Sequence, residues 1–140
     1  MSDEIHQLIS GFAKAFDAKD WQGLEALLSE RVDVDYSDLR GEHTVQSRQD
    51  YVAKRREALA ALQMRHVFTM LDVDVRGDTA TCRVSGWIER RLGERFFNSD
   101  VVYRFGLERS GGAWRIRSIA QTVIRNEGDP SIHSGVKSPR

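Results

Sequence analysis

The chain has 140 residues, a length that suits one domain with a single hydrophobic core. It carries 21 lysines and arginines against 21 aspartates and glutamates, so it offers no strongly basic surface for a nucleic-acid backbone. Cys82 is the one cysteine, which excludes an intrachain disulfide and a thiolate zinc centre. Residues 1–4 are acidic rather than signal-like and no apolar run reaches membrane-spanning length. We therefore expect a cytoplasmic protein whose partners include neither nucleic acid nor a membrane.

The first half of the sequence has the spacing of amphipathic helices. Apolar residues recur at three- and four-residue steps up to Ala18, and Asp20 is a suitable N-cap for the helix that follows. Ser47 and Asp50 resemble a capping box at the start of another helix. The predicted elements are a helix over 2–18, a helix over 21–28, a strand over 32–36, a loop over 39–44 and a helix over 47–62.

The second half alternates between apolar and polar residues, as half-buried strands do. The predicted strands cover residues 64–75, 79–91, 95–109 and 114–125. The intervening segments contain the turn signals Arg76-Gly77-Asp78, Leu92-Gly93-Glu94 and Ser110-Gly111-Gly112. From Asn126 the sequence contains glycine, proline and serine, so we expect a domain over 1–125 and a mobile or partner-draped extension over 126–140.

Helices that precede a run of antiparallel strands indicate the α+β class. We expect the N-terminal helices to pack in the concave face of a strongly curved, mainly antiparallel sheet. Such a sheet encloses a conical cavity, which is the default place for a ligand.

Three residues from separate segments carry acid–base chemistry. Asp17 ends an apolar helix face, Tyr36 ends a strand, and His66 shares a strand face with Phe68 and Met70. A carboxylate, a phenol and an imidazole in one cavity are sufficient for proton transfer on an organic molecule. Each has a plain alternative, since Asp17 fits a solvated turn, Tyr36 a core tyrosine and His66 a satisfied core histidine.

Other polar residues give weaker signals. Arg90 and Asp100, on neighbouring predicted strands, either form a pair that grips an anionic substrate or are a surface ion pair. Cys82 fits a small buried hydrophobe better than a reactive thiol. The remaining histidines, His6, His43 and His133, show no metal-ligand spacing, so we expect no metal site.

The order of these features resembles the SnoaL-like family. The resemblance covers residues 5–125 and rests on four motifs: Asp17-Ala18-Lys19-Asp20-Trp21, Val34-Asp35-Tyr36, Gly77-Asp78-Thr79-Ala80 and Gly112-Ala113-Trp114-Arg115-Ile116. This family belongs to the nuclear transport factor 2-like superfamily of cone-shaped α+β domains. The superfamily also holds scytalone dehydratase, ketosteroid isomerase and the β subunits of ring-hydroxylating dioxygenases.

The local resemblance is to scytalone dehydratase. It implies that Asp17, Tyr36 and His66 occupy catalytic positions. We expect the substrate to be contacted by Phe16, Phe68, Met70, Arg90 and Asp100. The second catalytic histidine of that enzyme has no counterpart, and Arg90 falls near its place.

Two functions follow as expectations. The first is a cofactor-independent dehydratase, isomerase or cyclase that acts by acid–base chemistry on a cyclic or polyketide-like molecule. The second is a non-catalytic ligand-binding or structural subunit that resembles a dioxygenase β subunit. In both, the outer face of the sheet predicts an oligomer, because Trp87, Tyr103 and Trp114 cannot all be internal. The resemblance implies a homodimer or homotrimer.

Overall fold

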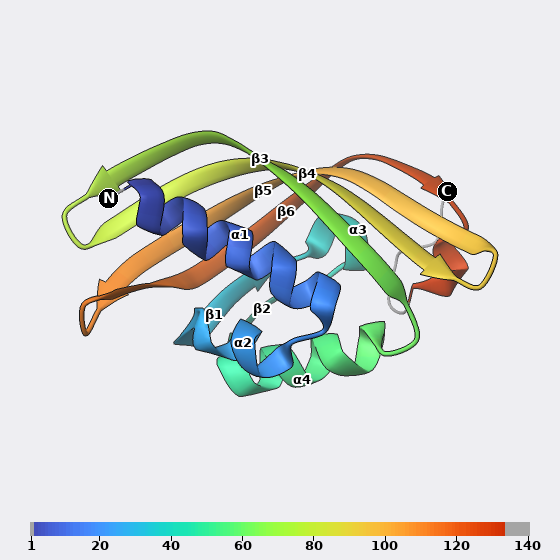
Figure 1. Cartoon of the computed structure of the whole chain (residues 1–140), viewed down its shortest axis with the longest axis horizontal. Coiled ribbons are helices and arrows are strands. Elements are labelled where there is room, and N and C mark those ends of the chain that lie inside the picture. The colour runs from blue at the N-terminus through green and yellow to red at the C-terminus, as the bar shows by residue number, and fades with distance from the viewer. Residues whose placement is uncertain (1, 134–140) are drawn as a thin grey trace.

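The computed structural model of the chain describes residues 2–133 (Figure 1). Its helices are α1 (Ser2–Ala18), α2 (Trp21–Ala26), α3 (Ser37–Arg40), α4 (Arg48–Leu59) and a final 3-10 turn, η1 (Pro130–Ile132). Its strands are β1 (Leu28–Asp35), β2 (His43–Ser47), β3 (Gln63–Arg76), β4 (Thr79–Leu92), β5 (Arg95–Ser110) and β6 (Ala113–Gly128). The α+β class and the four long strands that the sequence predicts are confirmed.

The six strands form one sheet in the order β2-β1-β6-β5-β4-β3. Neighbouring strands are antiparallel except β1 and β6, which are parallel because the chain crosses from one edge of the sheet to the other between them. The register shifts between Asp100 and Val101 and again between Gly106 and Leu107. Bulges of this kind bend a strand and increase its twist, which agrees with the strong curvature in Figure 1.

Helix α1 lies across the concave face of the sheet (Figure 1). Its buried stripe includes Ile5, Phe12 and Phe16, each at most 4% exposed, and the Phe12 ring meets the ring of Phe105 on β5 with 5.2 Å between centroids. Helices α2 and α4 pack against each other at the bottom of the view in Figure 1, and α4 also contacts β1 and β2. This arrangement confirms the predicted helices in the concave face of a curved sheet.

The loop predicted over 39–44 is wrong at both ends, and only residues 41–42 lie between elements. Residues 43–47 form β2, which pairs antiparallel with β1, and Ser37–Arg40 form the short helix α3. Most of β2 is exposed and shows no apolar alternation, so its strand conformation comes from pairing with β1 rather than from its own pattern.

The chain does not leave the domain at Asn126. Strand β6 continues to Gly128, the Asp129 amide donates to the Phe96 carbonyl at 2.7 Å, and η1 brings Ile132 and His133 into buried positions. Residues 126–133 are therefore part of the domain, in contrast to the predicted extension. The remainder of that predicted segment, 134–140, lies outside the described residues.

Two expectations about surfaces can be compared with the structure. Tyr103 and Trp114 are buried within the single chain, whereas Trp87 is half-buried on the outer face of β4. Among residues 2–133 there is no helix with the length and apolar character that crossing a bilayer requires.

Candidate active site

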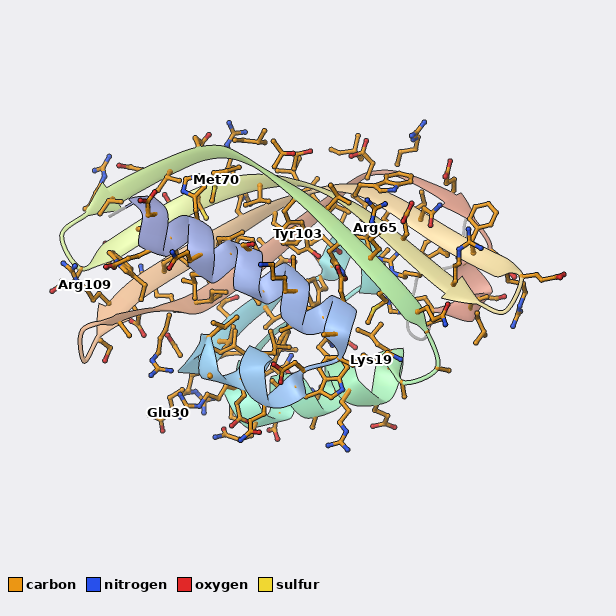
Figure 2. All side chains as sticks on the ribbon, viewed as in Figure 1. Lys19, Glu30, Arg65, Met70, Tyr103 and Arg109 are labelled. Atoms are coloured by element: carbon orange, nitrogen blue, oxygen red, sulfur yellow. The ribbon has the colours of Figure 1, made fainter. Side chains whose placement is uncertain are left out.

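The end of α1 fixes the position of Asp17. The Lys19 amide donates to the Phe16 carbonyl and the Asp20 amide donates to the Ala15 carbonyl, at 3.1 and 2.8 Å. These two bonds and the positive φ of Lys19, 54°, define a Schellman ending. Lys19 also donates from Nζ to the Ala60 carbonyl at 2.8 Å, which ties this corner to the end of α4 (Figure 2). The helix therefore ends one residue after Asp17, and the Asp17 carboxylate is directed at the adjoining strand β3.

Asp17 binds both the backbone and the ring of His66. Its Oδ1 and Oδ2 accept from the His66 amide at 2.9 and 3.0 Å, and Oδ1 lies 2.7 Å from Nδ1 of the imidazole. A carboxylate only accepts, so Nδ1 carries the proton and Nε2 keeps its lone pair. No hydrogen bond from within residues 2–133 engages Nε2. This is the arrangement of a base that is oriented by a carboxylate.

Burial lowers the pKa of His66 below its ordinary value of 6.5. The hydrogen bond and charge of Asp17 oppose the shift, and the positive charge of Arg90 adds to it. Because the imidazole side chain is 6% exposed, removal from water is the larger effect. His66 is therefore neutral at pH 7 and able to accept a proton.

His66 lines a cavity between α1, α4 and the concave face of the sheet. The cavity volume is about 40 Å³, which gives room for about three water molecules. The lining is mixed rather than apolar throughout: Phe16, Tyr36, Leu39, Arg55, Leu59, Met64, His66, Ile88, Arg90, Tyr103, Gln121 and His133.

Phenol groups supply hydrogen-bond donors to this cavity. The hydroxyls of Tyr36, at the end of β1, and Tyr51, on α4, lie 2.7 Å apart. Tyr103 on β5 accepts from Nε2 of Gln121 at 2.9 Å and lies on the face of the sheet that α1 covers (Figure 2). Burial raises the pKa of Tyr103 far above its ordinary value, so this phenol keeps its proton.

Two arginines also face the cavity. Arg55 on α4 is 5% exposed, and its guanidinium lies 5.3 and 5.5 Å from the ring centroids of Tyr36 and Tyr51. Arg90 on β4 is 3% exposed and donates to the Phe97 carbonyl at 3.3 Å and to the Ser99 hydroxyl at 2.9 Å. The cavity therefore combines the neutral imidazole of His66 and a second imidazole, that of His133, with phenols and positive charge.

The structure brings most of the predicted site residues together. His66, Tyr36, Phe16 and Arg90 all line the cavity. Asp17 lies behind the imidazole and lines a separate depression between α1 and β3, so it is a positioning residue for His66.

Three predicted substrate-binding residues lie elsewhere. Phe68 and Met70 line the depression beside Asp17, and Phe68 packs over Gly86, where an added Cβ would come within 3.2 Å of its ring. Asp100 is half-buried and points away from the inner face, because the buried residues of β5 are its neighbours Ser99 and Val101. The predicted pair of Arg90 and Asp100 is therefore wrong.

Sequence reasoning did not select four of the lining residues that carry polar groups: Arg55, Tyr103, Gln121 and His133. An inward position of Tyr103 follows from strand alternation with Val101 and Phe105. His133 reaches the cavity only because η1 turns the chain back, and no local pattern reports that contact.

The structure also bears on metal and thiol chemistry. Across residues 2–133 no three histidine, cysteine, aspartate or glutamate side chains are placed to hold a metal ion. Cys82 is 1% exposed, and burial raises the pKa of its thiol to about 12, which matches the predicted small buried hydrophobe.

These features define a class of protein. A curved mixed sheet with helices in its concave face and a partly polar cavity between them is a cone-shaped α+β fold. Solved structures share it. A Kribbella flavida protein has a TM-score of 0.88 at 21% identity, over 94% of this chain and 95% of that one. A candidate scytalone dehydratase from Novosphingobium aromaticivorans has a TM-score of 0.80 at 15% identity, over 90% and 85%.

A third similar structure is a hexachlorocyclohexane dehydrochlorinase, with a TM-score of 0.79 at 16% identity over 91% and 87% of the two chains. The SnoaL-like domain model matches residues 2–120, and the chain therefore belongs to the SnoaL-like family, as its sequence motifs predict. A search of curated proteins finds no match. At these identities the solved structures establish the fold.

Proposed function

We propose that this protein is a cofactor-independent enzyme that removes a proton from a small cyclic or polyketide-like molecule, as a dehydratase, isomerase or cyclase does. The observation that carries the proposal is the Asp17–His66 pair, which holds a neutral imidazole against a cavity that also contains phenol donors. His66 is the base through Nε2, and Asp17 fixes its tautomer. The Tyr36 hydroxyl, polarised by Tyr51, donates to the oxygen on which charge develops.

Exchange of carbon-bound hydrogen for deuterium tests this function without knowledge of the natural product. Small cyclic ketones and phenols are incubated with the protein in D2O, and loss of the proton signal is followed by NMR. We expect the wild type to accelerate exchange of at least one compound, and His66→Gln to lose about 10²-fold or more of that rate. His43→Gln is the matched control, since His43 is exposed on β2 and lies outside the cavity. Equal exchange by wild type and His66→Gln would remove His66 as the base.

The small cavity favours a second candidate, a non-catalytic ligand-binding or structural subunit. Room for about three water molecules is little for a cyclic substrate unless side chains move. The same experiment separates the two functions, because a non-catalytic domain binds members of the panel and exchanges none. A homodimer or homotrimer remains a proposal for either function, and sedimentation of the purified chain tests it.

A further inference from the structure

The charges around the cavity are unequal. Its lining contains two guanidinium groups, and among its described residues neither aspartate nor glutamate occurs. Asp17, the carboxylate that contacts His66, lies on the far side of the imidazole. An apolar or neutral substrate gives no reason for a buried guanidinium such as that of Arg55, because removing a charge from water costs several kcal/mol.

Arg55 is the clearer of the two. It is held by the faces of Tyr36 and Tyr51, and no carboxylate of residues 2–133 forms an ion pair with it. Its Nε–H is buried and has no acceptor within the described part of the chain. A buried guanidinium donor without an acceptor favours a ligand that brings one.

Arg90 places a second charge on the opposite wall, which β4 provides. It donates to the Phe97 carbonyl and the Ser99 hydroxyl, and its guanidinium lies 5.0 Å from the Phe97 ring centroid. Both arginines also act on Tyr103, whose pKa they lower against the larger effect of burial. Two elements far apart in sequence therefore direct positive charge at the same buried phenol.

Gln121 adds a complementary feature. Its Nε2 donates to Tyr103, and its Oε1 is buried with no donor among residues 2–133. Gln121 is 6% exposed and lines the cavity. A ligand hydroxyl would satisfy this oxygen, while a ligand carboxylate would satisfy the arginines.

We propose that the ligand of this cavity is a small organic carboxylate, held by Arg55 and Arg90, with a hydroxyl group that donates to Gln121. This proposal rests on the proposed function in one respect, which is that the reacting carbon of the ligand lies next to His66. The volume of about 40 Å³ sets the scale, because an acid of a few carbon atoms displaces about three water molecules.

The test is an NMR titration that compares butyrate with butyramide, its neutral counterpart, at constant ionic strength. Arg55 Nε–H and the Gln121 amide report binding directly. We expect butyrate to shift both signals saturably and butyramide to shift them little. 3-Hydroxybutyrate should bind more tightly than butyrate, because its hydroxyl meets Gln121.

Each arginine has a matched neighbour. Arg55→Met and Arg90→Met should raise the Kd of butyrate by about tenfold or more, whereas Arg56→Met and Arg91→Met, at exposed adjacent positions, should leave it within about twofold. Methionine keeps most of the side-chain volume, and the comparison of butyrate with butyramide on the wild type needs no variant at all. Equal binding of the acid and the amide would overturn the proposal, as would unchanged affinity in both buried-arginine variants.

His66→Gln separates this inference from the proposed function. It should keep butyrate binding while losing deuterium exchange. If the wild type prefers butyrate to butyramide but exchanges no deuterium, the carboxylate site is supported and the proposed enzymatic function is refuted. If the wild type exchanges deuterium but binds butyrate and butyramide equally, the enzymatic function is supported and the carboxylate site is refuted.

Discussion

Replacement of Asp17 by asparagine should reverse the tautomer of His66. In the wild type the two carboxylate oxygens take protons from the His66 amide, at 2.9 and 3.0 Å, and one of them takes the Nδ1 proton at 2.7 Å. An asparagine has one acceptor oxygen and one donating amide. With the oxygen on the His66 amide, the NH2 group faces Nδ1 and donates to it, so the ring proton moves to Nε2. The lone pair that faces the cavity is then lost.

The cost in stability follows from the same contacts. Asp17→Asn keeps a bond to the backbone amide and exchanges one bond to a charged acceptor for a neutral one. Hydrogen bonds to charged groups contribute about 1.5–3 kcal/mol, and the lower end applies because the Asp17 side chain is 30% exposed. We therefore expect the free energy of unfolding to fall by about 1.5 kcal/mol and Tm to fall by about 5 °C. Asp72→Asn is the control, since Asp72 pairs with Arg83 on the surface and should cost less than about 1 kcal/mol.

Long-range 15N NMR of the imidazole measures the tautomer without any substrate. The wild type should give the pattern of a protonated Nδ1, and Asp17→Asn that of a protonated Nε2. Deuterium exchange should fall by about 10²-fold in parallel. A wild-type tautomer in Asp17→Asn, or a wild-type exchange rate with the tautomer reversed, would refute the argument that Asp17 acts by orienting His66.

Three further predictions concern titration, reactivity and folding. The pKa of His66 in the folded state lies below 6.5, so the unfolded state binds its proton first as the pH falls. Urea unfolding between about pH 5 and 7 should therefore show a free energy of unfolding that decreases toward low pH. This dependence on pH should be weaker in His66→Gln. At pH 8 a thiol with a pKa of about 12 is on the order of 10⁻⁴ thiolate, so Cys82 should resist a disulfide reagent until guanidinium unfolds the chain; rapid native labelling would contradict its burial. Ser47 accepts from the Asp50 amide at 3.1 Å as the N-cap of α4, and Ser47→Ala should lower the free energy of unfolding by about 1 kcal/mol in urea, an effect that Ser47→Gly should largely avoid.

The sequence predicts correctly those helices and strands whose conformation is determined by residues within the element itself. The long strands were predictable because alternation and the glycine turns are local signals, and both Gly77 and Gly93 adopt the positive φ, 64°, that their turns require. Leu28 fitted the helical spacing of Trp21 and Leu24, yet it begins β1. Its place is decided by pairing with Ile116 on β6, a contact that short-range spacing cannot contain.

The candidate site divides in the same way. Asp17 and His66 are 49 residues apart, and their contact was predictable only through the resemblance of their motifs to a known family. Arg55 gave no such signal. It lies in a helix rich in charge, next to exposed Arg56, and only packing against two tyrosines distinguishes it from its neighbour.

Arg90 is the instructive intermediate case. It continues the inner-face series of β4 after Val84, Gly86 and Ile88, so strand alternation alone places it inside the cone. Its charge, beside Glu89 and Arg91, argues for the solvated end of a hairpin. In the structure Arg90 lies on the inner face, as alternation predicts. The Phe97 carbonyl, the Ser99 hydroxyl and the Phe97 ring offset part of the cost of burying its guanidinium. The Arg90 guanidinium also acts on His66, whose pKa its positive charge lowers. The residue near the place of a second histidine therefore adds to the lowering of the His66 pKa, of which burial is the larger cause.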